Sequence, residues 1–369
     1  MKNNWQTKKL EDCIDNVAYT TKIQRKNFLN DGEYPVVSQE EDLINGYWDK
    51  ASDLFRINGP VIVFGDHTKI LKYIDFDFVL GADGVKILQP KEFIFPKFFY
   101  YQLQMANLDS LGYARHYKLL KELEIKYPPL PEQKRIVIIL DEVFEKTAKA
   151  KENAEKNLQN ARELFASDLQ SVFANPGNGW EEKKLGEIGR VSMCKRVFKD
   201  QTTSTGDIPF YKIGTFGKKP DAYISKHLYD GFRKKFSFPK NGDVLISASG
   251  TIGRRVMYDG EPAYFQDSNI VWIDNDEKQV LNDYLYHFYG ACHWNSTKGA
   301  TISRLYNDNL KQIKITFPKS LAEQRTIVRR LEALSAETGR LEKIYRSKVQ
   351  AMVEFKKSIL QKAFNGELV

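Results

Sequence analysis

Basic residues gather in two loops in each half of the chain. In the first half, Gly65–Lys69 follows an apolar run and Gly112–Lys118 precedes a helical stretch. In the second half, Ser247–Arg255 and Lys298–Tyr306 take the matching places. Glycine lets the backbone approach a phosphate closely, whereas Arg, Lys and His reach phosphates or the edge of guanine. The chemistry that these loops offer is therefore non-covalent contact with a nucleic acid.

The loops and their basic neighbours supply a set of expected DNA contacts. Its members are Lys22, Arg25, His67, Thr68, Lys69, Arg115, His116, Tyr117, Lys118, Lys195, Arg196, Lys218, Lys219, Ser247, Ser249, Thr251, Arg254, Arg255, Ser303 and Arg304. A basic loop is more often only solvated, so each loop alone is a weak signal. Corresponding loops in both halves, all basic and all beside glycine, favour binding to nucleic acid.

Motifs for catalysis are missing from the sequence. Tyr127–Leu130 contains two prolines but lacks the Asn or Asp with which an amino-methyltransferase holds its target amine. Glu124–Lys126 resembles the end of a metal-nuclease motif without the preceding Pro-Asp, and no phosphate-binding or dinucleotide-binding glycine loop occurs. The five histidines have no metal-ligand spacing. We therefore predict no catalytic residue, no metal site and no cofactor in this chain.

Two long helical stretches must position the loops. Leu130–Val137 returns as Leu321–Val328, and each copy opens a segment whose apolar residues recur at the helical period. The period continues over 131–174, where Asn175–Gly177 ends it. A helix of this length is typical of an antiparallel coiled coil. The predicted core of the helix pair consists of Ile136, Leu140, Val143, Leu158, Ile327, Leu331, Leu334 and Leu341.

The remaining sequence predicts two α/β units that repeat each other. Tyr34–Val37 and Gly59–Gly65 are predicted strands and 96–107 a predicted helix, whereas residues 1–30 look irregular. Trp180–Leu185 then repeats Trp5–Leu10, and similar signals follow in the same order. We predict an α+β fold in which two α/β domains are joined by two long antiparallel coiled-coil helices, with a pseudo-twofold internal repeat. The predicted boundaries are 1–127, 128–175, 176–318 and 319–369.

Length and composition restrict the possible folds and functions less strongly than the motifs do. The 369 residues have enough apolar content for sizeable cores, and the net charge of +8, concentrated in the second half, favours a polyanionic partner. Cys13, Cys194 and Cys292 are far apart and lack Cys-x-x-Cys spacing, which argues against a disulfide framework. The sequence has neither an apolar signal core nor a membrane-spanning run, so we expect a cytoplasmic protein.

The repeat has more than one functional interpretation. A module duplicated at a fixed separation suits a ligand that also repeats along a line, and double-helical DNA is such a ligand. The alternative is a non-catalytic scaffold that spaces two protein-binding domains. A third interpretation is a stand-alone nuclease. A steep salt dependence of DNA binding would separate the first from the second, and cleavage with magnesium would favour the third.

Several motifs resemble those of type I restriction-modification specificity subunits. In the first half they are Phe76–Val85, Tyr113–Lys118, Pro128–Val137, Leu140–Phe144 and Asn157–Phe165. The second half contributes Ile302–Leu305 and Ala322–Gln324. The resemblance covers essentially the whole chain, and its helix motifs are specific to that family.

The resemblance implies a non-catalytic DNA-recognition subunit from a bacterium or archaeon. Target-recognition domains at 1–127 and 176–318 would each read a few base pairs of a bipartite target. A central conserved helix, 128–175, and a distal one, 319–369, would set the unspecified spacer and dock two methyltransferase subunits. Restriction and translocase subunits would join this complex. Adenine methylation and endonuclease activity would belong to the partners, and S-adenosylmethionine would bind the methyltransferase subunit.

Overall fold

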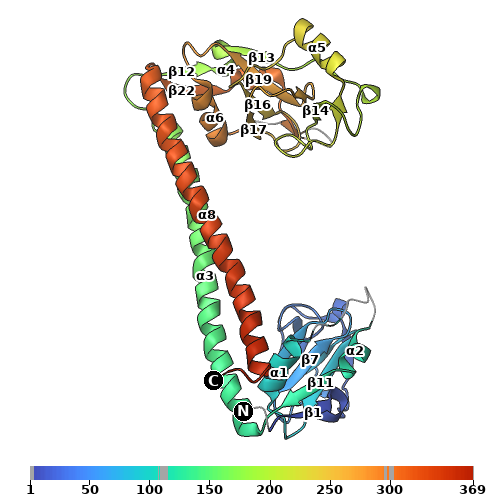
Figure 1. The fold of residues 1–369 in the computed structure, drawn as a ribbon. Coiled ribbons are helices and arrows are strands. Elements are labelled where there is room, and N and C mark those ends of the chain that lie inside the picture. The colour runs from blue at the N-terminus through green and yellow to red at the C-terminus, as the bar shows by residue number, and fades with distance from the viewer. Residues whose placement is uncertain (1–3, 107, 109–114, 295–296, 299–302, 369) are drawn as a thin grey trace. The chain divides into compact units, whose positions relative to one another are not determined.

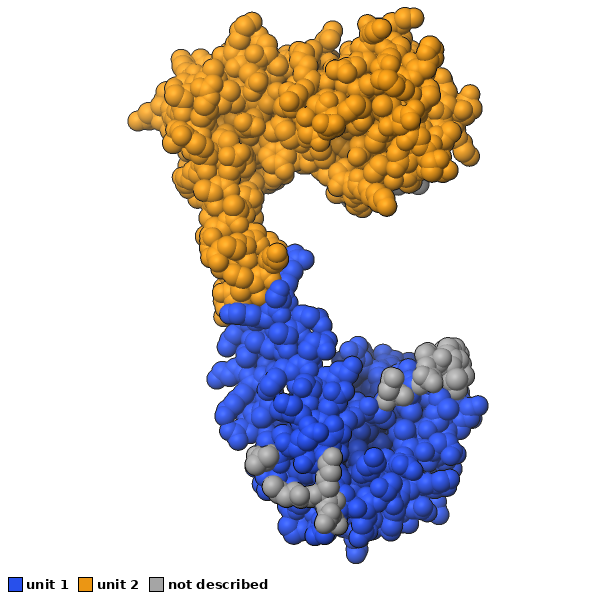
Figure 2. Space-filling model, viewed as in Figure 1, with its two compact units in different colours: residues 1–155, 346–369 blue, residues 156–345 orange. Residues whose placement is uncertain are grey.

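The computed structural model describes residues 4–106, 108, 115–294, 297–298 and 303–368. The chain forms two compact units, of which unit 1 comprises Met1–Glu155 and Arg346–Val369 and unit 2 comprises Lys156–Tyr345. Figure 2 colours the two units separately. Two long helices, α3 (Leu130–Ala174) and α8 (Leu321–Phe364), each contribute one part to unit 1 and another to unit 2.

Unit 1 contains two sheets and a separate strand pair (Figure 1). The first sheet is antiparallel, in the order β2-β10-β7-β8, and the second has the order β3-β9-β4-β5, with β6 paired to β9. The strands are β1 (Gln6–Lys9), β2 (Ile14–Asp15), β3 (Lys22–Gln24), β4 (Tyr34–Val37), β5 (Gly46–Trp48), β6 (Leu54–Phe55), β7 (Val61–Gly65), β8 (Leu71–Ile74), β9 (Phe78–Ala82), β10 (Val85–Pro90) and β11 (Glu124–Tyr127). The helices are α1 (Pro96–Gln104) and α2 (Tyr117–Lys121), with short 3-10 turns at Leu10–Cys13, Arg25–Asn27 and Ala51–Asp53.

Strand β7 is buried on both faces, which explains its continuous apolar sequence. Ile62 and Phe64 pack in the core that includes α1 and the long helices. Val61 and Val63 point the other way, into the core that the second sheet covers. Because side chains alternate along a strand, a strand between two cores needs apolar residues at every position.

The prediction of an irregular N-terminal stretch is wrong. Residues Gln6–Lys9 form β1, which pairs with β11 in antiparallel register, and β2 and β3 follow before residue 30. All four β1 residues are exposed, so the sequence carries no apolar alternation that could indicate a strand. Here the strand conformation follows from hydrogen bonding to a distant partner and not from local residue preference.

Unit 2 repeats the architecture of unit 1. Its main sheet has the order β13-β19-β16-β17, which corresponds strand for strand to β2-β10-β7-β8, and β12 pairs with β22 as β1 pairs with β11. The strands are β12 (Trp180–Lys184), β13 (Gly189–Ser192), β14 (Ile208–Tyr211), β15 (Tyr223–Ile224), β16 (Val244–Ser247), β17 (Arg255–Met257), β18 (Tyr264–Phe265), β19 (Ile270–Asn275), β20 (Thr297–Lys298), β21 (Ser303–Arg304) and β22 (Lys314–Pro318). The helices are α4 (Leu185–Ile188), α5 (Lys226–Lys235), α6 (Asn282–Ala291) and α7 (Asn307–Gln312), with a 3-10 turn at Lys199–Gln201.

The predicted internal repeat is therefore confirmed at the level of topology. The strands predicted to be equivalent in the two units are β4 and β14, and β7 and β16, and all four form. Helix α6 packs on β16 and β17 as α1 packs on β7 and β8. The second sheets differ, because β14 lies between β15 and β18 in unit 2 whereas β9 and β4 are central in unit 1. The two units thus share the main sheet, the helix packed on it and the separate strand pair.

The long helices pack antiparallel within each unit. In unit 1, Lys356 lies over the ring of Phe144 at 4.9 Å, and the Arg135 guanidinium donates to the Leu368 carbonyl oxygen at 3.1 Å. In unit 2, Arg162 forms an ion pair with Glu342 at 3.2 Å, and Arg330 forms one with Asp168. In each unit, the α3 residue that comes earlier in the chain contacts the partner residue that comes later. The two segments therefore run in opposite directions.

The residues expected in the helix-pair core lie in two environments. Ile136, Leu140 and Leu331 are fully buried, in clusters that also hold side chains of the globular part of their unit. The other five are half-buried: Val143, Leu158, Ile327, Leu334 and Leu341. Of these, Ile327 also packs against core clusters of unit 2. Each helix is therefore fixed most firmly where it meets its α/β domain.

A buried glutamine ties the start of each long helix to its α/β domain. Gln133 Oε1 accepts the Phe95 N–H at 2.8 Å, and its Nε2 donates to the carbonyl oxygens of Phe93 and Pro128 at 2.9 and 2.8 Å. Phe95 is the N-cap residue of α1.

Gln324 repeats this arrangement in unit 2. Its Oε1 accepts the N–H of Leu281, the N-cap residue of α6, at 2.9 Å, and its Nε2 donates to the carbonyl oxygens of Gln279 and Pro318 at 2.7 and 2.8 Å. Both amides are fully buried. A side chain with one acceptor and two donors satisfies three backbone groups that would otherwise lack partners.

Replacing either glutamine by leucine should destabilise its own unit. The substitution leaves one N–H and two carbonyl groups buried without partners, and we expect a loss of roughly 3 kcal/mol in the free energy of unfolding. Chemical denaturation of the full chain would measure it. Gln350→Leu, at an exposed position of α8, is the matched control, and a Gln133→Leu variant no less stable than this control would contradict the structural role.

Candidate nucleic-acid interface

Three segments of unit 1 converge where β7 ends. The Asp66 N–H donates to the Gly84 carbonyl oxygen at 2.8 Å, which ties the exit of β7 to the start of β10. The His116 N–H donates to the Asp66 carbonyl oxygen, also at 2.8 Å, which ties the same exit to the start of α2. These two backbone bonds place Arg115 beside the exit of β7.

The same two backbone bonds occur in unit 2. The Ala248 N–H donates to the Asn269 carbonyl oxygen at 2.7 Å, and the Leu305 N–H donates to the Ala248 carbonyl oxygen at 2.8 Å. Arg304 therefore occupies the position that Arg115 has in unit 1. Both arginines are exposed, as a contact with DNA requires.

His116 is not available as a DNA contact, which corrects the expectation from sequence. Its side chain is 1% exposed, and its Nδ1 lies 3.0 Å from the Asp66 carbonyl oxygen. The equivalent residue of unit 2 is Leu305, which is 3% exposed. The position thus belongs to the core of each unit, and proximity to Arg115 in the sequence made His116 look like part of the interface.

Ser247 and Ser249 are likewise buried. Ser247 Oγ donates to the Thr251 carbonyl oxygen at 2.6 Å and accepts the Arg254 N–H at 2.8 Å. It therefore shapes the loop after β16 and does not face a ligand. The Ser249 hydroxyl instead donates to Asn269 Oδ1 at 2.8 Å.

The cations of unit 1 surround the exit of β7. Lys22 is half-buried and donates to the Val85 carbonyl oxygen at 3.2 Å. Its pKa is lowered by burial first and then by the charge of Lys86, while Arg115 lowers it further and Asp83 and Asp66 raise it. Mutual electrostatic influence of this kind means that several cations share one region, which attracts an anion.

The remaining predicted residues of unit 1 lie around this region or are held elsewhere. The His67 N–H donates to Gln39 Oε1 at 3.2 Å, Thr68 Oγ1 donates to the Gln39 carbonyl oxygen at 2.7 Å, and Lys118 is exposed. Arg25, by contrast, is bound to Glu40 at 2.8 Å.

Tyr117 is half-buried in the same region. Its N–H donates to Asp66 Oδ1 at 2.7 Å, and Lys86 lies over its ring. The predicted loop residues 112–114 and 299–302, and the side chain of Ser303, lie outside what the structure describes.

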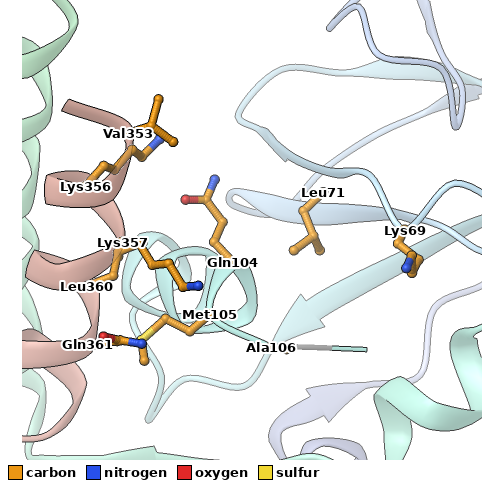
Figure 3. Close-up of a pocket in the computed structure, with 10 residues that line it drawn as sticks. All are labelled: Lys69, Leu71, Gln104, Met105, Ala106, Val353, Lys356, Lys357, Leu360 and Gln361. Atoms are coloured by element: carbon orange, nitrogen blue, oxygen red, sulfur yellow. The ribbon is translucent and has the colours of Figure 1, made fainter. Parts of the chain in front are cut away.

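A lysine-lined hollow lies between the end of α1 and the last part of α8 in unit 1 (Figure 3). Its volume is about 720 Å3, and Lys69, Lys356 and Lys357 line it together with the apolar side chains of Leu71 and Leu360. Lys69 lies across the hollow from Lys356 and Lys357 and donates to the Leu108 carbonyl oxygen at 3.3 Å, so the three lysines make the hollow positively charged without sharing one point. Lys69 is one of the DNA contacts predicted from the sequence, whereas Lys356 and Lys357 of α8 are not.

Unit 2 has a cavity of about 610 Å3 beside Arg304. Arg196, the exposed ring of Phe198 and the side chain of Asn269 also line it. Two carboxylates in the cavity are each paired with a cation, Asp267 with Arg196 and Asp221 with Lys212, both at 2.9 Å. Arg196 and Arg304, two residues predicted from sequence, are thus brought together, whereas Phe198 and Asn269 gave no recognisable signal.

Other predicted residues of unit 2 do not line this cavity. Lys195 lies over the ring of Phe236, and the Arg254 guanidinium donates to the Phe216 carbonyl oxygen at 3.0 Å. Lys218, Lys219 and Thr251 are exposed. Thr251 closes the β16 loop through its carbonyl group.

Arg255 lines a different cavity, next to a buried histidine. Its guanidinium lies 4.6 Å from the ring centroid of Tyr286, and His287 lines the same cavity together with Asp283 and Glu332. The His287 side chain is 5% exposed. Burial, and secondly the charge of Arg255, lower the pKa of His287 to about 4, so this imidazole is neutral at neutral pH.

Metal and membrane sites are not features of the described residues. Among them, no group of His, Cys, Asp and Glu side chains has the arrangement of a metal site. Their helices include none with an apolar stretch sufficient to span a bilayer.

The chain matches the family described as type I restriction modification DNA specificity domain over residues 2–159 and 177–350. A putative type I restriction enzyme specificity subunit of Haemophilus influenzae is 40% identical over 346 residues, which cover 90% of this chain and 88% of that protein. The EcoR124I/EcoR124II specificity subunit of Escherichia coli is 23% identical, with 86% of this chain and 83% of that protein covered.

Two solved structures share the fold. A chain from a study of complex assembly and conformational transition of the type I R-M system superposes with a TM-score of 0.76 at 19% identity, covering 99% of both chains. The HsdS subunit from Thermoanaerobacter tengcongensis superposes with a TM-score of 0.58 at 18% identity, covering 100% of this chain and 98% of that one.

The buried His287 should make the protein less stable in acid. Because its pKa in the folded chain, about 4, is below the unfolded value of about 6.5, the unfolded chain binds a proton that the folded chain does not. Stability therefore falls as pH drops from 6.5 to 4, by roughly 3 kcal/mol from this group. Thermal unfolding of wild type and His287→Gln across that range would measure it.

The variant should show a weaker dependence of stability on pH in that window. His293→Gln, at an exposed position near α6, provides the control. Equal slopes for wild type and His287→Gln would show that the buried imidazole does not contribute.

Proposed function

This chain belongs to the family of type I restriction-modification DNA specificity subunits, and we propose that each of its two units reads one half of a bipartite DNA target. The observation that carries this proposal is the duplicated framework of backbone hydrogen bonds, which presents Arg115 in unit 1 and Arg304 in unit 2 at equivalent positions. One chain thereby offers two reading sites built in the same way.

The reading sites combine two kinds of contact. Lys22, Lys86 and the lysines of the hollow in unit 1 supply charge for phosphates, which position the protein without selecting a sequence. Arg115 and Arg304 are able to reach base edges, where an arginine bonds guanine through two atoms. Because the side chains of the two reading sites differ, each site recognises different bases in its half of the target.

The long helices dock the partner subunits in this proposal. Exposed large apolar side chains lie on them, namely Ile138 and Phe355 in unit 1 and Leu164 in unit 2. A partner that covers these helices would remove those side chains from water. We assign this surface to two methyltransferase subunits, with restriction and translocase subunits joining the complex. The chain itself is non-catalytic in this scheme, and S-adenosylmethionine binds the methyltransferase partner.

Arg115→Ala should relax the reading of one half-site only. Losing a bidentate contact to a base costs about 1–3 kcal/mol of discrimination at one position. Sequencing of methylated sites in cells that carry the complete system would show additional sites that differ in one half of the target. Arg25→Ala, a cation held by Glu40, serves as control, and relaxation of both halves by Arg115→Ala would contradict independent reading.

The helix pair should determine the length of the unspecified spacer. Four residues inserted into both α3 and α8 at the junction of the two units add one turn, or ~6 Å of helix. We expect methylated sites with a longer spacer and unchanged half-sites. Altered half-sites with an unchanged spacer would refute this role for the helices.

A further inference from the structure

The cavity beside Arg304 in unit 2 is lined by Asn269. Its amide oxygen accepts hydrogen bonds, whereas its Nδ2 donor has no partner in the part of the chain that the structure describes. We propose that Asn269, held by Ser249 and Arg304, makes this cavity selective for guanine in the half-site that unit 2 reads. This inference rests on the proposed function, because it names the base recognised by one of the two reading sites.

The orientation of the amide follows from its partners. The Ser249 hydroxyl donates to Asn269 Oδ1 at 2.8 Å, and the Arg304 Nη2 donates to the same atom at 3.4 Å. A guanidinium has donors only, so the atom that faces Arg304 must be the acceptor of the amide. The Nδ2 group has no hydrogen-bond partner among the described residues, and Asn269 lines the cavity.

The backbone holds this amide firmly. The Asn269 carbonyl oxygen accepts the Ala248 N–H at 2.7 Å, and its N–H donates to the Asp267 carbonyl oxygen at 2.7 Å. Ser249 is buried and its backbone bridges to Arg304 as in a β-sheet. A reading group fixed in this way keeps its position before DNA binds, so little ordering entropy opposes recognition.

The chemistry of the fixed amide selects against adenine. Asparagine normally reads adenine by accepting from N6 and donating to N7. Here Oδ1 is already occupied by two donors, so Asn269 Nδ2 and Arg304 present only donors. Guanine offers two adjacent acceptors, O6 and N7, whereas the N6 amino group of adenine would face donors without an acceptor.

Acidic side chains in the cavity do not reverse this preference. Asp267 and Asp221 would favour the amino group of cytosine if they were directed towards the base. Each instead forms an ion pair at 2.9 Å, with Arg196 and Lys212. Both carboxylates are thus directed towards cations, whereas the Nδ2 donor of Asn269 has no partner within the described ranges of the chain.

Unit 1 has no room for the same device. Gly84 provides the carbonyl that corresponds to that of Asn269, but it has no side chain. A Cβ atom there would lie 2.8 Å from Gln39 Oε1 and 2.9 Å from His67 Cδ2, and Gly84 has a φ of +80°. In unit 1, Gln39 and His67 thus occupy the space that the Asn269 side chain has in unit 2. The proposed selection of guanine by an amide therefore applies to unit 2 alone.

The test uses the complete methyltransferase complex with wild-type and variant chains. Methylated-site sequencing would identify the half-site that Arg304→Ala alters, and duplexes with each base at the altered position would be compared by fluorescence anisotropy. Wild type should prefer guanine over adenine at one position of that half-site by about tenfold or more. Asn269→Ala should reduce this preference several-fold while the other half-site is read as before.

Asn269→Asp, which keeps the size of the side chain, tests the donor directly. It replaces the Nδ2 donor by an acceptor, so the preference at the same position should move from guanine towards bases with an amino group. Asn241→Ala, at an exposed position of unit 2 outside the cavity, is the control, and melting temperatures would show that all variants are folded.

Two results would overturn the inference. One is a wild-type half-site without guanine at the position that Arg304 affects. The other is an Asn269→Ala variant that binds all four duplexes with equally reduced affinity, which is the behaviour of a phosphate contact. A wild-type complex with no preference for any sequence would instead refute the proposed function itself.

Discussion

The architecture depends on two buried amides. Gln133 and Gln324 each bond three backbone groups, one of which is the N-cap of the helix that packs on the main sheet. A buried amide with all its partners is a directional contact, because a shift or rotation of the long helix would leave backbone groups unpaired. The orientation of α3 and α8 against their domains is therefore fixed by hydrogen bonds, while apolar burial supplies most of the stability.

The duplicated loop framework separates structure from specificity. Two backbone hydrogen bonds hold the strand exit in both units, and they use only N–H and carbonyl groups. Side chains at these positions are free to differ without a change in the framework, as buried His116 and Leu305, or buried Gly84 and half-buried Asn269, demonstrate. One framework is thus able to present different reading groups in the two units.

Sequence reasoning succeeded where a pattern extends over many residues. The helical period of α3 and α8 and the continuous apolar sequence of β7 and β16 lead to correct elements, because burial against a core demands an apolar residue at each regular position. It failed for β1, whose exposed polar residues carry no pattern, and for His116, which is buried although Arg115 before it is exposed. Short elements that depend on distant partners have no local signature.

The sequence by itself determined the duplication, the two long helices, the family and the approximate places of the basic loops, because each of these is written in residue types repeated along the chain. The tertiary structure alone decided which side chains share one site. Arg196, Asn269 and Arg304 are remote in sequence and meet only because strand pairing brings their segments together. Whether Asn269 offers a donor or an acceptor depends on Ser249 and Arg304, and such a choice is made by geometry that no linear pattern records.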